Sequence, residues 1–269
     1  MCIFASVLLL TPVAGCRSGG GDSQQIIVSG STTILPIAEV SGEMFTEQNA
    51  DTKILVSGLG SSAGIESVSA GTSDIGSSSR DLKDTEGDLG LVDTPIALDA
   101  IAVIVSPSNP IDELTSQQVR DIFSGKTLNW SELGGPDRAI GIVNRDEASG
   151  TREAFYKILM KEEPFFRGAA VLPGTGQVRS VVSQAPGAIG YISLGFVTDE
   201  VKSIRIDGIE ASSATVEDGT YPIQRTLHFF TKGEPEGLAA TFIEFILSDT
   251  VQQGVVRDAG FLPVPKKAE

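Results

Sequence analysis

The residues best suited to chemistry in this chain lie in one short stretch, Arg145-Asp146-Glu147-Ala148-Ser149-Gly150-Thr151. An apolar run at 140–143 precedes it and an amphipathic run follows it, so the order predicts a strand, a tight turn and a helix. Ser149 or Thr151 can cap that helix, and Gly150 lets a ligand approach the backbone. A helix N-terminus and the charged fork of Arg145 both suit an oxyanion. The stretch predicts an oxyanion clamp; an ordinary capped helix beside a surface Arg–Glu pair is the alternative.

Three other predicted strands also end in turns rich in hydroxyl groups and glycine. The runs at 26–28 and 53–56 are typical of short buried strands, and Asp74-Ile75-Gly76 begins a third short strand. The turns that follow them contain Thr32 and Thr33, then Ser61, and then Ser79 with Arg80. Such an order predicts a parallel α/β sheet whose ligand crevice lies beyond the carboxyl ends of its strands.

Two long apolar runs, at 97–105 and 226–230, separate two such α/β units. We expect them to join two lobes, with the second lobe inserted into the first. The predicted boundaries are 25–103 and 225–269 for lobe 1 and 104–224 for lobe 2. One continuous domain is the alternative.

Composition limits the possible functions. The 269-residue chain has a formal net charge of −15 and a sequence pI near 4.5, which argues against nucleic acid as a partner. An anion can still bind locally, because salt screens distant charges beyond roughly 8 Å. His228 is the single histidine and the cysteines, Cys2 and Cys16, both lie near the N-terminus, so no zinc site or Ser-His-Asp triad is expected.

The first 24 residues read as a signal and tether. An apolar run at 3–10 is too short to span a bilayer, and Val13-Ala14-Gly15-Cys16 resembles a lipoprotein lipobox with Cys16 as the lipidated residue. No Lys or Arg precedes the run, which departs from that pattern. Residues 17–23 have the composition of a flexible linker. A disordered apolar tail is the alternative.

Several motifs in a fixed order carry a family resemblance: Gly30-Ser31-Thr32-Thr33, Gly60-Ser61-Ser62-Ala63-Gly64, Asp74-Ile75-Gly76, Arg145 to Thr151, and Pro186-Gly187-Ala188-Ile189-Gly190-Tyr191. Over residues 25–265 the chain resembles the phosphate-binding proteins (PstS type) of phosphate ABC importers. The resemblance implies an α/β, two-lobed periplasmic-binding-protein fold of type II-like organisation, with two hinge strands. It implies an extracytoplasmic, lipid-anchored monomer that binds inorganic phosphate, needs no cofactor and delivers the ion to permease subunits.

The resemblance also implies the ligand-binding residues, which are Thr32, Thr33, Ser61, Ser79, Arg145, Ser149, Gly150 and Thr151. Glu147 is expected to hold Arg145 in place, and Arg80 either supports the site or forms a structural salt bridge. Some family members have an aspartate at the position of Ser79, where it accepts the proton of phosphate. The same fold could therefore bind sulfate or another tetrahedral oxyanion, and selectivity between phosphate and sulfate stays open.

Two other functions are alternatives. A surface adhesin or signalling protein could keep the fold without transport. A serine hydrolase or phosphatase is disfavoured, because Gly58-Leu59-Gly60-Ser61-Ser62 lacks the Gly-x-Ser-x-Gly pattern and the histidine lies in an apolar run.

Overall fold

Three parallel strands form one end of the sheet, as the apolar runs predict. The computed structural model describes residues 24–265. In it β1 (Gln24–Gly30) pairs on one side with β2 (Thr52–Gly58) and on the other with β3 (Ile75–Ser78). The crossovers are the helices α1 (Leu35–Gln48) and α2 (Ser61–Ser69). The carboxyl ends of these strands, with their hydroxyl-bearing turns, therefore meet at one edge.

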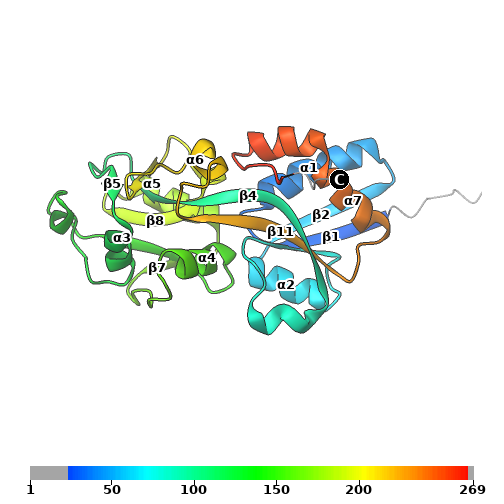
Figure 1. Ribbon diagram of the computed structural model, residues 1–269, viewed down its shortest axis with the longest axis horizontal. Coiled ribbons are helices and arrows are strands. Elements are labelled where there is room, and N and C mark those ends of the chain that lie inside the picture. The colour runs from blue at the N-terminus through cyan, green and yellow to red at the C-terminus, as the bar shows by residue number, and fades with distance from the viewer. Residues whose placement is uncertain (1–23, 266–269) are drawn as a thin grey trace, which may run out of the picture.

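Two long antiparallel strands link this end to the rest of the molecule. They are β4 (Leu91–Val105) and β11 (Gln224–Lys232), and Figure 1 shows both running between the two halves. The sheet order is β2-β1-β3-β11-β4-β8-β6-β7, with β9 also paired to β4. We call the half with β1–β3 lobe 1 and the half with β6–β8 lobe 2.

Lobe 2 repeats the α/β pattern on the other side of the long strands. Its larger sheet contains β6 (Gly141–Arg145), β7 (Ala170–Leu172), β8 (Ala188–Ser193) and β9 (Lys202–Ser203), and a separate pair is formed by β5 (Glu113–Leu114) and β10 (Arg205–Ile206). Its helices are α3 (Ser116–Phe123), α4 (Gly150–Ile158), α5 (Thr175–Gln184) and α6 (Ser213–Glu217). The chain returns to lobe 1 through β11 and ends with α7 (Gly237–Leu247) and a π-helical turn, Val251–Val256.

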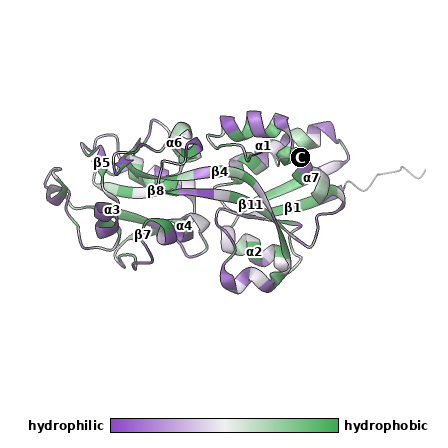
Figure 2. Ribbon diagram, viewed as in Figure 1, coloured by the Kyte–Doolittle hydropathy of each residue, from purple (hydrophilic) through white to green (hydrophobic). Residues whose placement is uncertain are grey.

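Each lobe has its own hydrophobic core. Along β4 the core of lobe 1 includes Ala97 and the core of lobe 2 includes Ala100. Leu227 in β11 belongs to the core of lobe 1, and Ile223, which directly precedes β11, belongs to the core of lobe 2. Figure 2 shows hydrophobic strand segments in both halves of the molecule. Trp130 is fully buried in the core of lobe 2. The expected two-lobed α/β fold with two connecting strands is thus confirmed.

Two segments differ from what their sequence predicts. Residues 65–71 have the pattern of a short helix closed by Gly71, but α2 already begins at Ser61, directly after Gly60 with φ +97°. Residues 207–222 have an irregular pattern, but they contain α6, whose N-terminus is capped by Ser212. The predicted lipobox and Cys16 lie outside the described residues. Within residues 24–265, no helix combines the length and apolar character needed to cross a membrane.

Candidate anion-binding site

Lobe 1 contributes hydroxyl groups from three turns at the carboxyl ends of its strands. Thr32 and Thr33 lie between β1 and α1, and no side chain caps that helix. Ser61 is the first residue of α2, whose N-cap is Gly60, so its hydroxyl is not used as a cap. The Ser61 Oγ accepts a hydrogen bond from the backbone N–H of Ser79 at 3.1 Å and lies 3.3 Å from the Ser79 Oγ. Helix capping therefore does not account for these hydroxyl groups.

Lobe 2 contributes the stretch from Arg145 to Thr151. Arg145 is the last residue of β6, and Ser149 is the N-cap of α4, where its hydroxyl accepts from the N–H of Arg152 at 3.2 Å. Gly150 and Thr151 form the first turn of α4, and both are buried. The predicted order of strand, turn and capped helix is confirmed.

The structure brings the two sets together across the lobe interface. The Thr33 Oγ1 lies 3.2 Å from the Thr151 Oγ1, and Arg145 Nη2 donates to the Thr32 Oγ1 at 3.3 Å. At Gly150 the backbone of lobe 2 lies very close to two turns of lobe 1. A Cβ at this position would lie 2.3 Å from the Ser61 Oγ and 2.8 Å from the Ser79 Oγ. Any side chain at this position would push the lobes apart.

Neutral oxygen atoms hold the Arg145 guanidinium. Its Nε donates to the carbonyl of Leu172 at 3.1 Å, Nη2 to the carbonyl of Pro173 at 2.7 Å, and Nη1 to the Thr175 Oγ1 at 3.1 Å. Burial lowers the pKa of Arg145, and Asp146 is among the groups that oppose this shift, but an arginine remains protonated. Among residues 24–265 no carboxylate forms an ion pair with Arg145, so the site has a buried positive charge without a salt bridge.

Glu147 does not hold Arg145 as we expected. Its side chain is exposed, and the carbonyl oxygens of Leu172 and Pro173 occupy the positions where the glutamate would act. The turn between β6 and α4 directs Glu147 to solvent, which its spacing in the sequence could not reveal.

Arg80 forms a structural salt bridge, which was the second of its two expected roles. It pairs with Glu86 at 2.7 Å and donates to the Ser62 Oγ at 3.2 Å. The salt bridge ties the turn after β3 to the 3₁₀ helix Asp84–Leu89.

A second arginine, not foreseen from the sequence, lies beside the site. Arg225 on β11 donates from Nε and Nη2 to the Asp99 Oδ2 at 2.9 and 2.7 Å, and the two residues are register partners on β11 and β4. Its Nη1 donates to the Ser79 carbonyl at 3.1 Å, and its Nη2 lies 3.4 Å from the Thr33 Oγ1. Burial raises the pKa of the Asp99 carboxyl and lowers that of Arg225, and the partner charge opposes each shift. The signal was available: Asp99 and Arg225 are charged residues within or next to long apolar runs.

Thr175 was also missed. It begins α5, is fully buried, and contacts Arg145, Thr32 and Thr33. The sequence around it, Pro173-Gly174-Thr175-Gly176, has the same glycine-and-hydroxyl character as the other turns. The strand before it, β7, has three residues and gave no periodic signal.

Helix dipoles add to the positive character of the site. The helices α2, α4 and α5 begin at Ser61, Gly150 and Thr175, and α1 begins just after Thr33. Each helix N-terminus presents free N–H groups and about half a positive charge. Four N-termini, several hydroxyl groups and one unpaired guanidinium together favour a small oxyanion.

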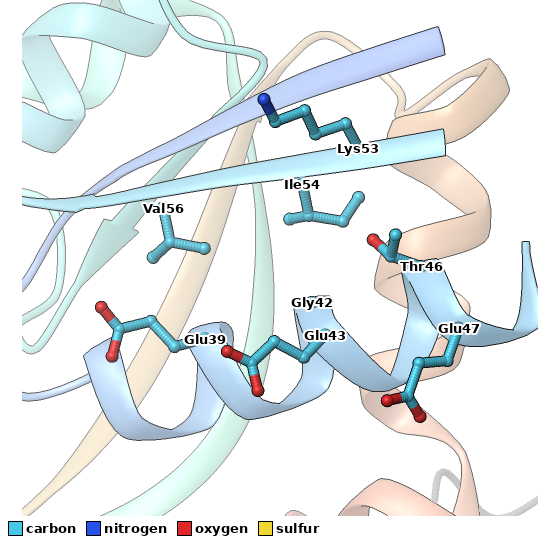
Figure 3. Close-up of a pocket in the computed structure, with 8 residues that line it drawn as sticks. All are labelled: Glu39, Gly42, Glu43, Thr46, Glu47, Lys53, Ile54 and Val56. Atoms are coloured by element: carbon cyan, nitrogen blue, oxygen red, sulfur yellow. The ribbon is translucent and has the colours of Figure 1, made fainter. Parts of the chain in front are cut away.

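Other hollows in the described chain differ in the charge of their lining residues. Figure 3 shows one of about 470 Å³ between α1 and β2, where Glu39, Glu43 and Glu47 form a row of carboxylates along the helix. Their negative charge would repel an anion. A groove of about 300 Å³ lies between the lobes beside Arg225, and Arg80 and Lys157 line it. In residues 24–265 no group of three or more His, Cys, Asp or Glu side chains could hold a metal ion.

Comparison with known proteins identifies the family. Residues 17–250 match the model of the PBP superfamily domain. The chain is 35% identical over 245 residues to the phosphate-binding protein PstS of Bacillus subtilis, an alignment that covers 90% of this chain and 81% of the relative. It is 31% identical to the protein of the same name from Borreliella burgdorferi, with 90% and 91% covered.

Solved structures agree with the sequence relatives. A putative phosphate ABC transporter substrate-binding protein from Clostridium perfringens, with bound phosphate, superposes with a TM-score of 0.86 at 38% identity, covering 90% of this chain and all of that one. An ABC-type phosphate transport receptor from Vibrio cholerae gives a TM-score of 0.75 at 30% identity, with 89% and 100% covered. The family model, the sequence relatives and the matching fold establish that the chain belongs to the PstS-type phosphate-binding proteins of the PBP superfamily.

Proposed function

We propose that this protein is an extracytoplasmic receptor that captures inorganic phosphate between its lobes and delivers it to the permease subunits of an ABC importer. The observation that carries the proposal is Arg145, a buried guanidinium with no salt bridge, surrounded by hydroxyl groups from both lobes. Relatives named for phosphate binding and phosphate transport support the same ligand.

The proposed ligand residues are Thr32, Thr33, Ser61, Ser79, Arg145, Ser149, Gly150 and Thr151. A buried dianion loses much hydration energy unless donors surround it. Neutral hydrogen bonds contribute about 1 kcal/mol each and charge-assisted ones about 1.5–3 kcal/mol. Several of these acting together suffice for micromolar affinity, which corresponds to about −8.2 kcal/mol. Because the donors converge from separate turns, they suit a compact tetrahedral anion.

The two lobes would open and close around the anion by a hinge motion. We place residues 25–103 and 225–269 in lobe 1 and residues 104–224 in lobe 2. The change from one core to the other within β4 and β11 supports a hinge in these strands. Opening would separate the pairs Thr33–Thr151 and Arg145–Thr32, so the complete site would exist in the closed form alone.

Sulfate is the second candidate anion. Phosphate carries a proton near neutral pH and sulfate carries none, so a carboxylate in the site would reject sulfate. Ser79 is a hydroxyl that both donates and accepts, and it therefore discriminates less.

We further propose that the protein acts as a monomer, anchored to the membrane by a lipid on Cys16. The lipobox-like residues Val13–Cys16 support the anchor. Cys16→Ser should move the protein from the membrane fraction to the soluble fraction, and unchanged membrane association would argue against lipidation at this residue.

Titration calorimetry tests the anion proposal. Protein stripped of bound anion by partial unfolding and refolding is titrated with phosphate and, separately, with sulfate. We expect phosphate to bind with micromolar or lower dissociation constant and sulfate more weakly. Equal or tighter binding of sulfate would reassign the ligand, and no binding of either would reject the receptor.

A further inference from the structure

Thr175 lies at a point where the site residues of both lobes meet. Its side chain is fully buried at the start of α5 in lobe 2. Its Oγ1 lies 3.1 Å from Arg145 Nη1, 3.1 Å from the Thr32 Oγ1 and 3.4 Å from the Thr33 Oγ1. Two of these three partners belong to lobe 1, so the hydroxyl does not simply stabilise its own lobe.

Helix capping does not explain this hydroxyl. The N-cap of α5 is Gly174, and its N–H is satisfied by the side chain of Gln177 at 3.0 Å. Thr175 is the first residue inside the helix, and its Oγ1 accepts no backbone N–H among the described residues. A threonine placed only to start the helix would have no reason to face Arg145.

The direction of the hydrogen bonds indicates a missing acceptor. An arginine can only donate, so the hydroxyls of Thr175 and Thr32 both accept from Arg145 and keep their own protons to donate. Thr32, Thr175, Thr33 and Thr151 carry four hydroxyl protons, and three contacts join them into a chain. At least one proton therefore has no acceptor within the cluster. Buried hydroxyls normally have a partner, and an oxyanion supplies acceptors only.

From this geometry we propose that Thr175 is a further binding residue of the anion site: its hydroxyl accepts from Arg145 and donates to the anion. The inference rests on the proposed function and adds a third element of lobe 2, the N-terminus of α5, to the residues carried over from the family. Because Thr175 meets Thr32 and Thr33 across the interface, its contribution should belong to the closed form. Removing the hydroxyl should therefore act mainly on the rate of anion release.

The test compares two substitutions of Thr175 with a control. Thr175→Val keeps the shape and removes the hydroxyl, and Thr175→Ser keeps the hydroxyl. Thr198→Val makes the same change at an exposed position of lobe 2. Inorganic phosphate is the probe, with calorimetry for affinity and stopped-flow fluorescence for the dissociation rate.

We expect Thr175→Val to raise the dissociation constant about tenfold, the loss of one charge-assisted hydrogen bond, with most of the change in the dissociation rate. Thr175→Ser should stay within about threefold of the parent and Thr198→Val should match it. Thermal stability without phosphate should change little in all three. Should Thr175→Val fold poorly, Thr175→Ala is compared with Thr175→Ser in the same way.

The outcomes separate this inference from the receptor proposal. If the parent binds phosphate and Thr175→Val binds it equally well, Thr175 is structural and the inference is wrong. A lower melting temperature with unchanged affinity has the same meaning. If the parent binds neither phosphate nor sulfate, the receptor proposal fails and this inference fails with it.

Discussion

Two buried arginines lie at the same interlobe contact but have different partners. Arg225 is paired with Asp99 through two hydrogen bonds of 2.7 and 2.9 Å, and Arg145 is held by carbonyl and hydroxyl oxygens. Both positive charges are removed from water. The charge of Arg225 is neutralised within the protein, so it can position Thr33 and Ser79 without a ligand. Arg145 has no such counter-charge among the described residues, and in the proposed function an anion would supply it.

The comparison shows how one site can combine stability with affinity. A buried ion pair across β4 and β11 fixes the connecting strands, and its contacts reach lobe 2 through the Ser193 hydroxyl, which donates to Asp99 at 2.7 Å. A buried guanidinium without a counter-charge lowers the stability of the protein. An anion bound to it would offset this loss. The two arginines should therefore respond differently to substitution.

The largest effect is expected on stability when the paired arginine loses its partner. Asp99→Asn leaves Arg225 buried without a counter-charge and should lower the free energy of unfolding by about 3–5 kcal/mol. Denaturant unfolding in anion-free buffer measures this free energy. The double variant Asp99→Leu with Arg225→Met removes both charges, and its free energy of unfolding should fall clearly less. A loss below about 1 kcal/mol for Asp99→Asn would mean that the pair does not stabilise the fold.

The unpaired arginine should show the reverse behaviour. Arg145→Met is expected to raise the phosphate dissociation constant at least about 100-fold, because charge-assisted hydrogen bonds contribute about 1.5–3 kcal/mol each. The same variant should unfold at nearly the parent denaturant concentration, since it removes a buried charge without leaving a counter-charge behind. Calorimetry and denaturation measure the two quantities. A large loss of stability with intact binding would reverse our assignment of the two arginines.

A carboxylate at position 79 should make the proposed site discriminate between the two anions. Ser79→Asp is expected to weaken sulfate binding by about tenfold more than phosphate binding, because phosphate can donate a proton to the carboxylate and sulfate meets only repulsion. Competition of each anion against the same fluorescent phosphate analogue measures the ratio. Ser79→Asn, which adds similar bulk without charge, is the control, and an equal change for both anions would exclude a selectivity role for this position.

The smallest effect is expected at the acidic residue first assigned to Arg145. Glu147 is exposed and lacks contact with the guanidinium, so Glu147→Gln should leave the dissociation constant of phosphate within about twofold of the parent. A tenfold change would show that Glu147 approaches Arg145 when the anion is bound.

The sequence determined a good deal of this protein by itself. The apolar runs predicted the strands, because a strand that is covered on both sides is apolar on both faces. The turns after them gave Thr32, Thr33, Ser61 and the stretch from Arg145 to Thr151, because glycine and hydroxyl residues are needed where helix N-termini meet a ligand.

Other features depended on the tertiary structure. Arg225 and Asp99 are 126 residues apart and become partners only through the register of β4 and β11. Thr175 follows a strand too short to leave a periodic signal. Glu147 is exposed, and two carbonyl groups that are distant in the sequence hold Arg145 instead. Spacing along the chain predicts which residues share a turn. The packing of the two lobes decides which turns come together and which charged residues form ion pairs.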